Sequence, residues 1–447
     1  MPMNLNSNVT LREFGDGIVY LENQVTHLKA WLKDEDAETV KALPEIKTDA
    51  NIAALQKLRE LWFVDEDDDG DHRDFSYARK REAGNLAAAG NPWEKPLLQD
   101  NTPWLNNLQI ELTDSCNERC IHCYMPGSLK DRADEMDFEA VKDLLEQYRA
   151  MNGVRVVFSG GEIFLHKDLF KILDLCRKLG LFVLLQTNLL ILTPQLLDKL
   201  KTLRIFNIQV SLYSTDPAVH DAITTKKGSC LRTMANIRKL VEADIPIIIA
   251  CPVMKQNFDS VADVQAFADS LGVEVYYDYI MMAQSNGLTE NLDHRISLAQ
   301  TRGMIDFLLV HKDEFRRAIE TSGTAEELLA KQFARRRNVC SILSSGLCVS
   351  PDGSAYPCPG WKGFSLGDLA KSSLDSIWSA SEKARELRSI DMDADFEKCR
   401  SCTLRNFCDM CAVYNYNESG DIYHVSERFC EVAAIFRQAV IDKFHSL

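Results

Sequence analysis

The sequence has a deficit of basic residues, no long apolar run and no basic, apolar N-terminus. Its 447 residues include 51 Lys and Arg against 66 Asp and Glu, a formal net charge of -15. Because nucleic-acid binding depends on neutralising phosphates, this balance argues against a nucleic-acid partner. The most apolar stretches, such as 181–192 and 245–253, are shorter than the ~20 residues that cross a bilayer. Together with the lack of a secretory signal, this predicts a cytoplasmic protein with no membrane partner.

Cysteine, in contrast, is abundant, with fourteen in the chain. In a reducing compartment clustered thiols serve as metal ligands rather than as disulfides. Three of them lie between residues 116 and 123, and eight lie beyond residue 338. Of the other three, Cys176 is expected in the core. Cys230 and Cys251 are also expected there, but they lie near strand ends, so a role as hydrogen-atom donor stays open for either.

Hydrophobic patterning divides the chain into three predicted units. Residues 1–98 combine short strands and helices, typical of a small winged-helix-like α+β module, and end in a polar linker. Residues 105–315 alternate apolar strands, such as 108–112 and 182–186, with amphipathic helices. This pattern predicts an α/β fold, a partial (β/α)6 TIM-like barrel with its chemistry at the C-terminal strand ends. Residues 335–447 show short elements and dense cysteines, which predicts a domain held together by metal sites.

The first motif is the run Cys116-Asn-Glu-Arg-Cys120-Ile-His-Cys123, directly after the strand at 108–112. Three thiolates on one loop can bind three irons of a cubane cluster and leave the fourth iron open, whereas structural zinc takes four ligands. His122 is not expected as a fourth ligand, since adjacent side chains in a tight loop point apart. The spacing, followed by Tyr124, resembles the radical S-adenosylmethionine (SAM) superfamily.

Three further segments are similar to that family. Ser159-Gly160-Gly161-Glu162 resembles the GGE motif, whose backbone and carboxylate receive the methionine amino group. Gln186-Thr187-Asn188 and Gln209-Val-Ser211-Leu-Tyr213 stand where the family has TNG and SLD, with Leu189 in place of Gly and Tyr213 in place of Asp. Thr224 replaces the Arg of an HDxxR pattern. The resemblance implies these SAM-binding residues: Tyr124, Gly160, Gly161, Glu162, Asn188 and Ser211.

The C-terminal cysteines resemble the SPASM extension of radical SAM enzymes. Gly353-x4-Cys358 is followed by Cys399-x2-Cys402-x5-Cys408-x2-Cys411, although the last spacing is usually three residues. A zinc ribbon is the alternative for two CxxC pairs. The resemblance implies two auxiliary [4Fe-4S] clusters, three clusters in all. The implied ligands of the first, SAM-binding cluster are Cys116, Cys120 and Cys123. Those of the second cluster are Cys340, Cys358 and Cys411, with either Cys348 or an open iron at the fourth position. Those of the third cluster are Cys399, Cys402, Cys408 and Cys430.

The combination of modules predicts a radical SAM peptide maturase. By resemblance, a 5′-deoxyadenosyl radical would abstract hydrogen from a ribosomally made precursor peptide and install a thioether or carbon–carbon crosslink. The N-terminal unit would hold the leader, and a flavodoxin- or ferredoxin-like protein would supply electrons. The alternatives are a sulfatase-type formylglycine maturase, a peptide epimerase, and a non-enzymatic iron–sulfur electron-transfer or sensor protein. Pro359 after Cys358 disfavours the sulfatase type, where Asp is usual.

Overall fold

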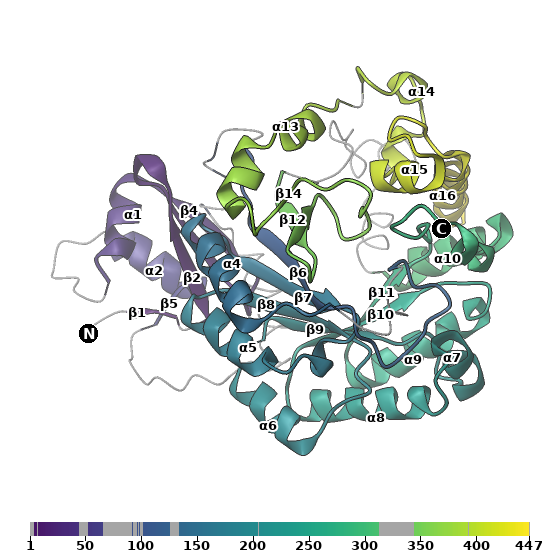
Figure 1. Cartoon of the computed structure of the whole chain (residues 1–447), viewed down its shortest axis with the longest axis horizontal. Coiled ribbons are helices and arrows are strands. Elements are labelled where there is room, and N and C mark those ends of the chain that lie inside the picture. The colour runs from purple at the N-terminus through teal and green to yellow at the C-terminus, as the bar shows by residue number, and fades with distance from the viewer. Residues whose placement is uncertain are drawn as a thin grey trace.

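A long mixed sheet runs through the molecule (Figure 1). The computed structural model describes residues 4–6, 8–43, 52–65, 92, 96, 98, 102–125, 134–203, 205–312, 344–391 and 393–446, so the predicted ligand Cys340 lies outside the described residues. The strands lie in the order β11-β10-β9-β8-β7-β6-β12-β13-β14. Those from β6 to β11 pair in parallel: β6 (Asn107–Thr113), β7 (Arg155–Gly160), β8 (Phe182–Thr187), β9 (Asn207–Ser211), β10 (Ile247–Pro252) and β11 (Glu274–Asp278).

Helices connect these parallel strands, which confirms the predicted α/β class. They are α4 (Phe138–Ala150), α5 (Leu169–Lys178), α6 (Pro194–Thr202), α7 (Pro217–Thr224), α8 (Ser229–Glu242) and α9 (Val261–Leu271), followed by α10 (Leu298–His311). Local signals set their starts. The Asp137 side chain accepts a hydrogen bond from the Ala140 amide at the start of α4, and Thr193 caps α6 before Pro194. This mostly parallel βα arrangement is that of a TIM-like fold.

The C-terminal segment continues the same sheet. β12 (Gly346–Val349) pairs in parallel with β6, and β13 (Ser354–Tyr356) and β14 (Gly367–Asp368) follow antiparallel. Next come α13 (Glu382–Arg388), α14 (Glu397–Arg400), α15 (Ala412–Ser419) and α16 (Glu427–His445). The expectation of short elements here was wrong for α16, which has 19 residues. Phe429, Ala433, Phe436 and Val440 recur at helical spacing, and all but Phe429 join the cluster that packs on α10.

The N-terminal module has a sheet and a core of its own. β2 (Val9–Glu13), β3 (Val19–Asn23) and β4 (Lys29–Leu32) form an antiparallel sheet, followed by α1 (Asp34–Lys41) and α2 (Ile52–Glu60). β1 (Asn4–Leu5) pairs with β5 (Val64–Asp65). Its core is one cluster of buried residues: Val19, Leu21, Ala30, Leu32, Ala37, Val40, Leu58, Leu61, Phe63 and Val64.

One face of this small sheet is docked against the barrel. Arg12 is buried, and its guanidinium donates to the carbonyls of Gly153 and Gly180 at 2.8 and 2.7 Å. Trp31 packs edge-on against Trp104, which stands three residues before the start of β6. Gly153 and Gly180 stand two residues before the first residues of β7 and β8, so the module lies at the N-terminal ends of the parallel strands, on the left of Figure 1. The module therefore leaves the opposite, C-terminal ends of the parallel strands uncovered by its own residues.

Candidate functional site

A cavity of about 780 Å³ opens at the C-terminal ends of the parallel strands. Its walls follow from strand alternation. On β6, Leu108 and Ile110 are buried in the core, whereas Gln109 and Glu111 line the cavity. The other parallel strands and the residues that follow them add further polar side chains to the lining, among them Ser159, Gln186, Asn188, Gln209, Ser211 and Asp278. The barrel interior is thus polar at this end, as a binding site requires.

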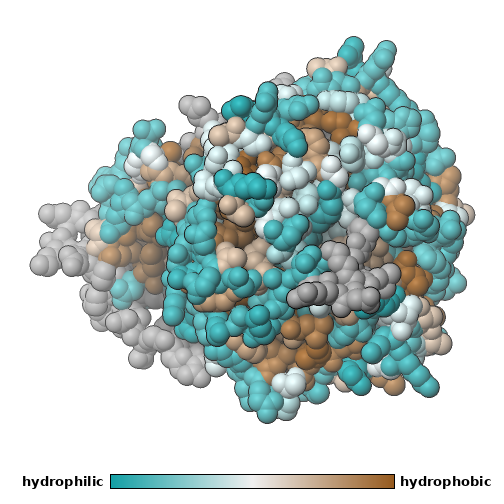
Figure 2. Space-filling view, in the orientation of Figure 1, coloured by the Kyte–Doolittle hydropathy of each residue, from teal (hydrophilic) through white to brown (hydrophobic). Residues whose placement is uncertain are grey.

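Hydrophilic side chains cover most of the face shown in Figure 2, and apolar residues reach it in separate patches. Among the described residues, none of the helices is long and apolar enough to cross a membrane.

The two glycines of the GGE motif hold the loop that starts the cysteine run. The Gly161 amide donates to the Thr113 carbonyl and the Glu162 amide to the Ser115 carbonyl, both at 2.7 Å. A Cβ on Gly161 would lie 2.0 Å from the Ser115 oxygen, and Gly160 has a φ of +129°. Glycine is therefore needed here for close approach of two backbone segments. These contacts fix the path of the chain between the end of β6 and Cys116.

Cys116, Cys120 and Cys123 all line the cavity. Burial raises the pKa of Cys116 to about 11 and raises the pKa of the other two thiols. Such thiols are neutral until a metal centre displaces their protons. In the described part of the chain, no three His, Cys, Asp or Glu side chains converge as ligands of a single metal ion. A cubane cluster takes one thiolate on each of three irons and so needs a wider spacing, which three cysteines on one loop fit.

The Glu162 carboxylate is fully buried and turned away from the cavity. It accepts hydrogen bonds from the Thr187 hydroxyl at 2.7 Å, the Asn188 amide at 2.8 Å and the Phe164 amide at 3.0 Å. Its side chain therefore ties the end of β7 to the end of β8, and it is absent from the cavity wall in the described structure. Contact between this carboxylate and a methionine amino group stays a prediction.

The other predicted SAM-binding residues, Tyr124, Gly160, Gly161, Asn188 and Ser211, line the cavity. The Asn188 side chain donates to the Asn117 carboxamide oxygen at 2.6 Å and lies 3.9 Å from the Cys116 sulfur. This contact joins the end of β8 to the cysteine run. The structure thus brings the three sequence motifs to one site, while their individual roles remain predictions.

His122 lies against Tyr213, with ring centroids 4.8 Å apart and planes nearly perpendicular. Its Nδ1 atom is shielded from solvent and has no hydrogen-bond partner within the described structure. Burial lowers the pKa of His122 to about 4, so the ring is neutral at pH 7. The ring is therefore packed as a neutral aromatic group, and the expectation that His122 is not an iron ligand stays a prediction.

The C-terminal cysteines fall into two groups. Cys358 lines the cavity, and Cys348 is buried on β12 beside Lys362. Cys399 packs in a second group with Cys408, Cys411 and Cys430. The neighbouring thiols Cys402 and Cys430 contribute, after burial, to a raised pKa of Cys399, which places Cys402 with this group. Cys411, which was assigned by resemblance to the second cluster, packs beside the cysteines assigned to the third; the ligand sets themselves stay predictions.

The structure does not support Cys230 or Cys251 as hydrogen-atom donors. Both thiols are fully buried, and neither lines the cavity. The Cys230 sulfur faces the Ser214 carbonyl at 3.5 Å, and the Cys251 sulfur faces the Tyr213 carbonyl at 3.8 Å. The physical reason is strand and helix direction, because Cys251 points from β10 into the layer between sheet and helices.

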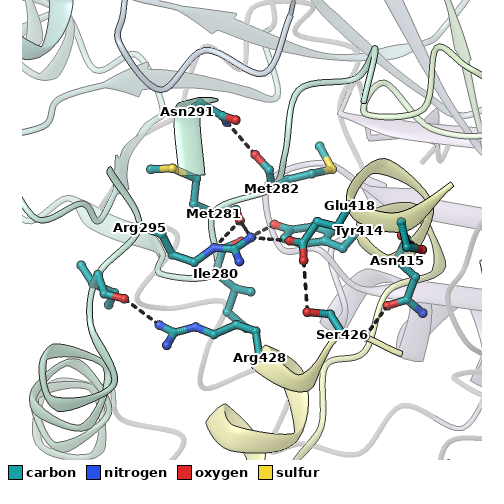
Figure 3. A network of polar contacts seen from close by, with 12 residues as sticks. Ile280, Met281, Met282, Asn291, Arg295, Tyr414, Asn415, Glu418, Ser426 and Arg428 are labelled. Atoms are coloured by element: carbon teal, nitrogen blue, oxygen red, sulfur yellow. Dashed lines mark hydrogen bonds and ion pairs between the residues drawn. The ribbon is translucent and has the colours of Figure 1, made fainter. Parts of the chain in front are cut away.

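The loop after β11 forms the wall shared with the C-terminal domain (Figure 3). Arg295 donates to the Met281 carbonyl and to the Glu418 carboxylate, the latter at 2.5 Å. The Tyr414 hydroxyl donates to the Ile280 carbonyl at 2.5 Å. Met281 and Tyr414 both line the cavity. This network fixes the cavity wall where α15 meets the barrel.

Sequence reasoning missed several lining residues, among them Gln109, Glu111, Asp278 and Lys362. The polar positions every second residue in 107–113 were a usable signal for the first two, since a strand buried on both faces would be apolar throughout. Lys362 carried no local signal.

Fold and site together describe an α/β protein with three cysteines on one loop at the C-terminal mouth of its barrel, an arrangement typical of an iron–sulfur enzyme. Residues 110–268 match the Radical SAM superfamily, and residues 340–403 match SPASM, an iron-sulfur cluster-binding domain. The chain therefore contains a radical SAM domain followed by a SPASM domain. A radical SAM domain binds SAM and a [4Fe-4S] cluster.

Similar proteins include several with different products. The AdoMet-dependent heme synthase of Methanosarcina barkeri is 26% identical over 75% of this chain and 98% of its own length. The antilisterial bacteriocin subtilosin biosynthesis protein AlbA of Bacillus subtilis is 25% identical over 84% of this chain and 83% of its own. The crystal structure of Streptococcus suis SuiB bound to precursor peptide SuiA aligns with a TM-score of 0.61 at 14% identity, covering 93% of this chain and 97% of SuiB, which shows a shared fold.

Proposed function

We propose that this enzyme is a cytoplasmic peptide maturase that modifies a ribosomally made precursor peptide. The cofactors would be SAM and three [4Fe-4S] clusters, with domains at 1–98, 105–315 and 335–447. A SAM-derived 5′-deoxyadenosyl radical would abstract a substrate hydrogen and lead to a thioether or carbon–carbon crosslink. A flavodoxin- or ferredoxin-like protein would supply the electrons. The proposal rests mainly on one observation, which is that the N-terminal module is docked onto a radical SAM barrel.

The coverage of the relatives supports this choice. The alignment with the heme synthase includes 98% of that protein but only 75% of this chain. About a quarter of this chain therefore has no counterpart in the heme synthase. SuiB, whose structure contains its precursor peptide, matches 93% of this chain. An additional module suits a substrate that is long enough to be held at a distance from the reacting residue.

The module offers its strand edges to a peptide. Arg12, Tyr20 and Trp31 are cross-strand neighbours on the face docked to the barrel. The opposite face carries Leu21 and Leu32 into the module's own core. With both faces covered, an extended leader would bind by adding a strand to the edge strand β2 or β4, where backbone groups give affinity.

The residues around the cavity have distinct parts in this proposal. Cys116, Cys120 and Cys123 would hold the first cluster, and bound SAM would supply the radical. Asn188 and Ser211 would orient the SAM ribose and carboxylate from the ends of β8 and β9. The cavity wall formed by the Arg295 network would shield the radical from water.

The test uses the full-length enzyme, reconstituted anaerobically with iron and sulfide. It is incubated with SAM, a reductant and each peptide encoded by small reading frames beside its gene. Loss of two hydrogen atoms from a peptide, with 5′-deoxyadenosine formed, is expected for a crosslink. Unchanged mass with deuterium uptake from D₂O would indicate epimerisation instead. Formation of haem, or 5′-deoxyadenosine with every peptide unaltered, would reject the proposal; Cys120→Ala serves as the inactive control.

A further inference from the structure

Tyr213 lies beside the middle cysteine of the cluster loop. It follows β9 by two residues, lines the cavity and is 5% exposed. Its hydroxyl oxygen is 3.8 Å from the Cys120 sulfur, within the range of a hydrogen bond to sulfur. At this position the sequence departs from the acidic residue of the resembled SLD pattern.

The phenol ring is held from several sides. The Tyr213 amide donates to Nδ1 of His220 at 3.2 Å, and its carbonyl accepts from the Asn257 side chain at 2.8 Å. The ring also contacts the rings of His122 and His220, at centroid distances of 4.8 and 5.3 Å. Because backbone and ring are both fixed, the direction of the hydroxyl toward Cys120 is built into the fold.

The chemistry of a cluster-bound cysteine determines which atom donates. A thiolate on iron has no proton, so the Cys120 sulfur would accept and the Tyr213 hydroxyl would donate. The Oε2 atom of Glu118 also lies 3.6 Å from this sulfur, and an ionised carboxylate has no proton to donate to it. An acidic residue at position 213 would have the same limitation, whereas tyrosine brings a neutral donor.

We propose that Tyr213 is a positioning residue that donates a hydrogen bond to Cys120 and raises the reduction potential of the SAM-binding cluster. Hydrogen bonds to cluster sulfurs are one of the factors that set this potential. Reduction adds negative charge to the cluster, so a donor at the sulfur stabilises the reduced form more than the oxidised form. The proposal concerns only the first cluster and stands whatever substrate the enzyme modifies.

The test compares the reconstituted wild-type enzyme with Tyr213→Phe. At a fixed applied potential we expect a roughly tenfold lower ratio of reduced to oxidised first cluster in the variant, about 59 mV for a one-electron couple. The readout is a potentiometric titration followed by electron paramagnetic resonance, using the signal that changes when SAM is added. Tyr277→Phe is the matched control, since Tyr277 is buried in the same sheet and its hydroxyl faces the Val261 carbonyl.

A variant with 4-aminophenylalanine in place of Tyr213 separates the donor from the shape of the ring. It keeps an N–H donor on a similar ring, so we expect it to restore most of the wild-type potential. If Tyr213→Phe takes up no first cluster but the amino variant does, the donor is needed for assembly and the proposal is supported. An unchanged potential in Tyr213→Phe, or loss of the cluster in both variants, overturns it.

Discussion

Lys362 of the C-terminal domain forms an ion pair with Glu111 of the first barrel strand, with Nζ and Oε2 2.7 Å apart. Glu111 is 1% exposed, and the same ammonium donates to the Ser350 hydroxyl at 2.6 Å and lies over the Tyr356 ring. The pair therefore joins the two domains at the cavity wall, where a buried carboxylate depends on a cation supplied from outside the radical SAM domain.

Removing that cation alone should destabilise the enzyme strongly. Lys362→Met leaves the Glu111 carboxylate buried and unpaired, a change that costs about 3–5 kcal/mol in comparable pairs. Denaturant unfolding of the reconstituted enzyme should show a lower midpoint than wild type. Because the double variant Glu111→Gln/Lys362→Met has no unpaired charge, it should be more stable than Lys362→Met. A double variant no more stable than the single one would contradict this account.

Gly161→Ala should release the first cluster without affecting the others. Its Cβ would stand 2.0 Å from the Ser115 carbonyl oxygen, so the segment before Cys116 must move. Iron analysis and the SAM-sensitive paramagnetic signal should show loss of about one cluster per chain. Gly346→Ala in β12 is the matched control, because its Cβ would have the Asn107 oxygen at an ordinary 3.8 Å. Equal iron content in the two variants would disprove the prediction.

Cysteine replacement should separate SAM cleavage from substrate turnover. Cys120→Ala should abolish 5′-deoxyadenosine formation, since a cubane with two thiolates is poorly held. Cys402→Ala should keep some reductive cleavage, because Cys402 belongs to the distant C-terminal group, but peptide modification should stop. The 5′-deoxyadenosine and the modified peptide are both measured by liquid chromatography and mass spectrometry. Full peptide turnover by Cys402→Ala would show that the third cluster is dispensable.

Stability should fall in mild acid because of His220. Burial lowers its pKa from 6.5 to about 4, so between these values the unfolded chain binds a proton that the folded chain does not. The free energy of unfolding is therefore unaffected by this group above pH 6.5. Between the two pKa values it falls by about 1.4 kcal/mol for each unit by which the pH is lowered. The melting temperatures of the wild type and His220→Gln are compared at neutral pH and in mild acid. The drop in melting temperature on acidification should be smaller in the variant. An equal drop in both proteins would refute this role of His220.

Local patterns predicted much of the barrel. The strands predicted at 108–112 and 182–186 lie within β6 (Asn107–Thr113) and β8 (Phe182–Thr187), because an apolar run is a local feature of the sequence. The short α7 was missed, since its eight residues give little periodicity. The three cysteines and two glycines were found because their chemistry depends on spacing.

The remaining parts of the site depend on contacts between distant residues. Lys362 and Glu111 are 251 positions apart, and neither has a local feature that names its partner. The orientation of Glu162 away from the cavity likewise depends on Thr187 and Asn188 of the next strand. Such pairings arise from the packing of the whole sheet, which spacing along the chain does not encode.

The docking of the N-terminal sheet below β7 and β8 has a consequence for any peptide held there. Its reacting residue must reach the far mouth of the barrel, past strands such as β7, which has six residues and thus a length of roughly 20 Å. At least about six extended residues must therefore separate the docked stretch from the modified one. A peptide shortened below that limit would stay bound yet escape reaction.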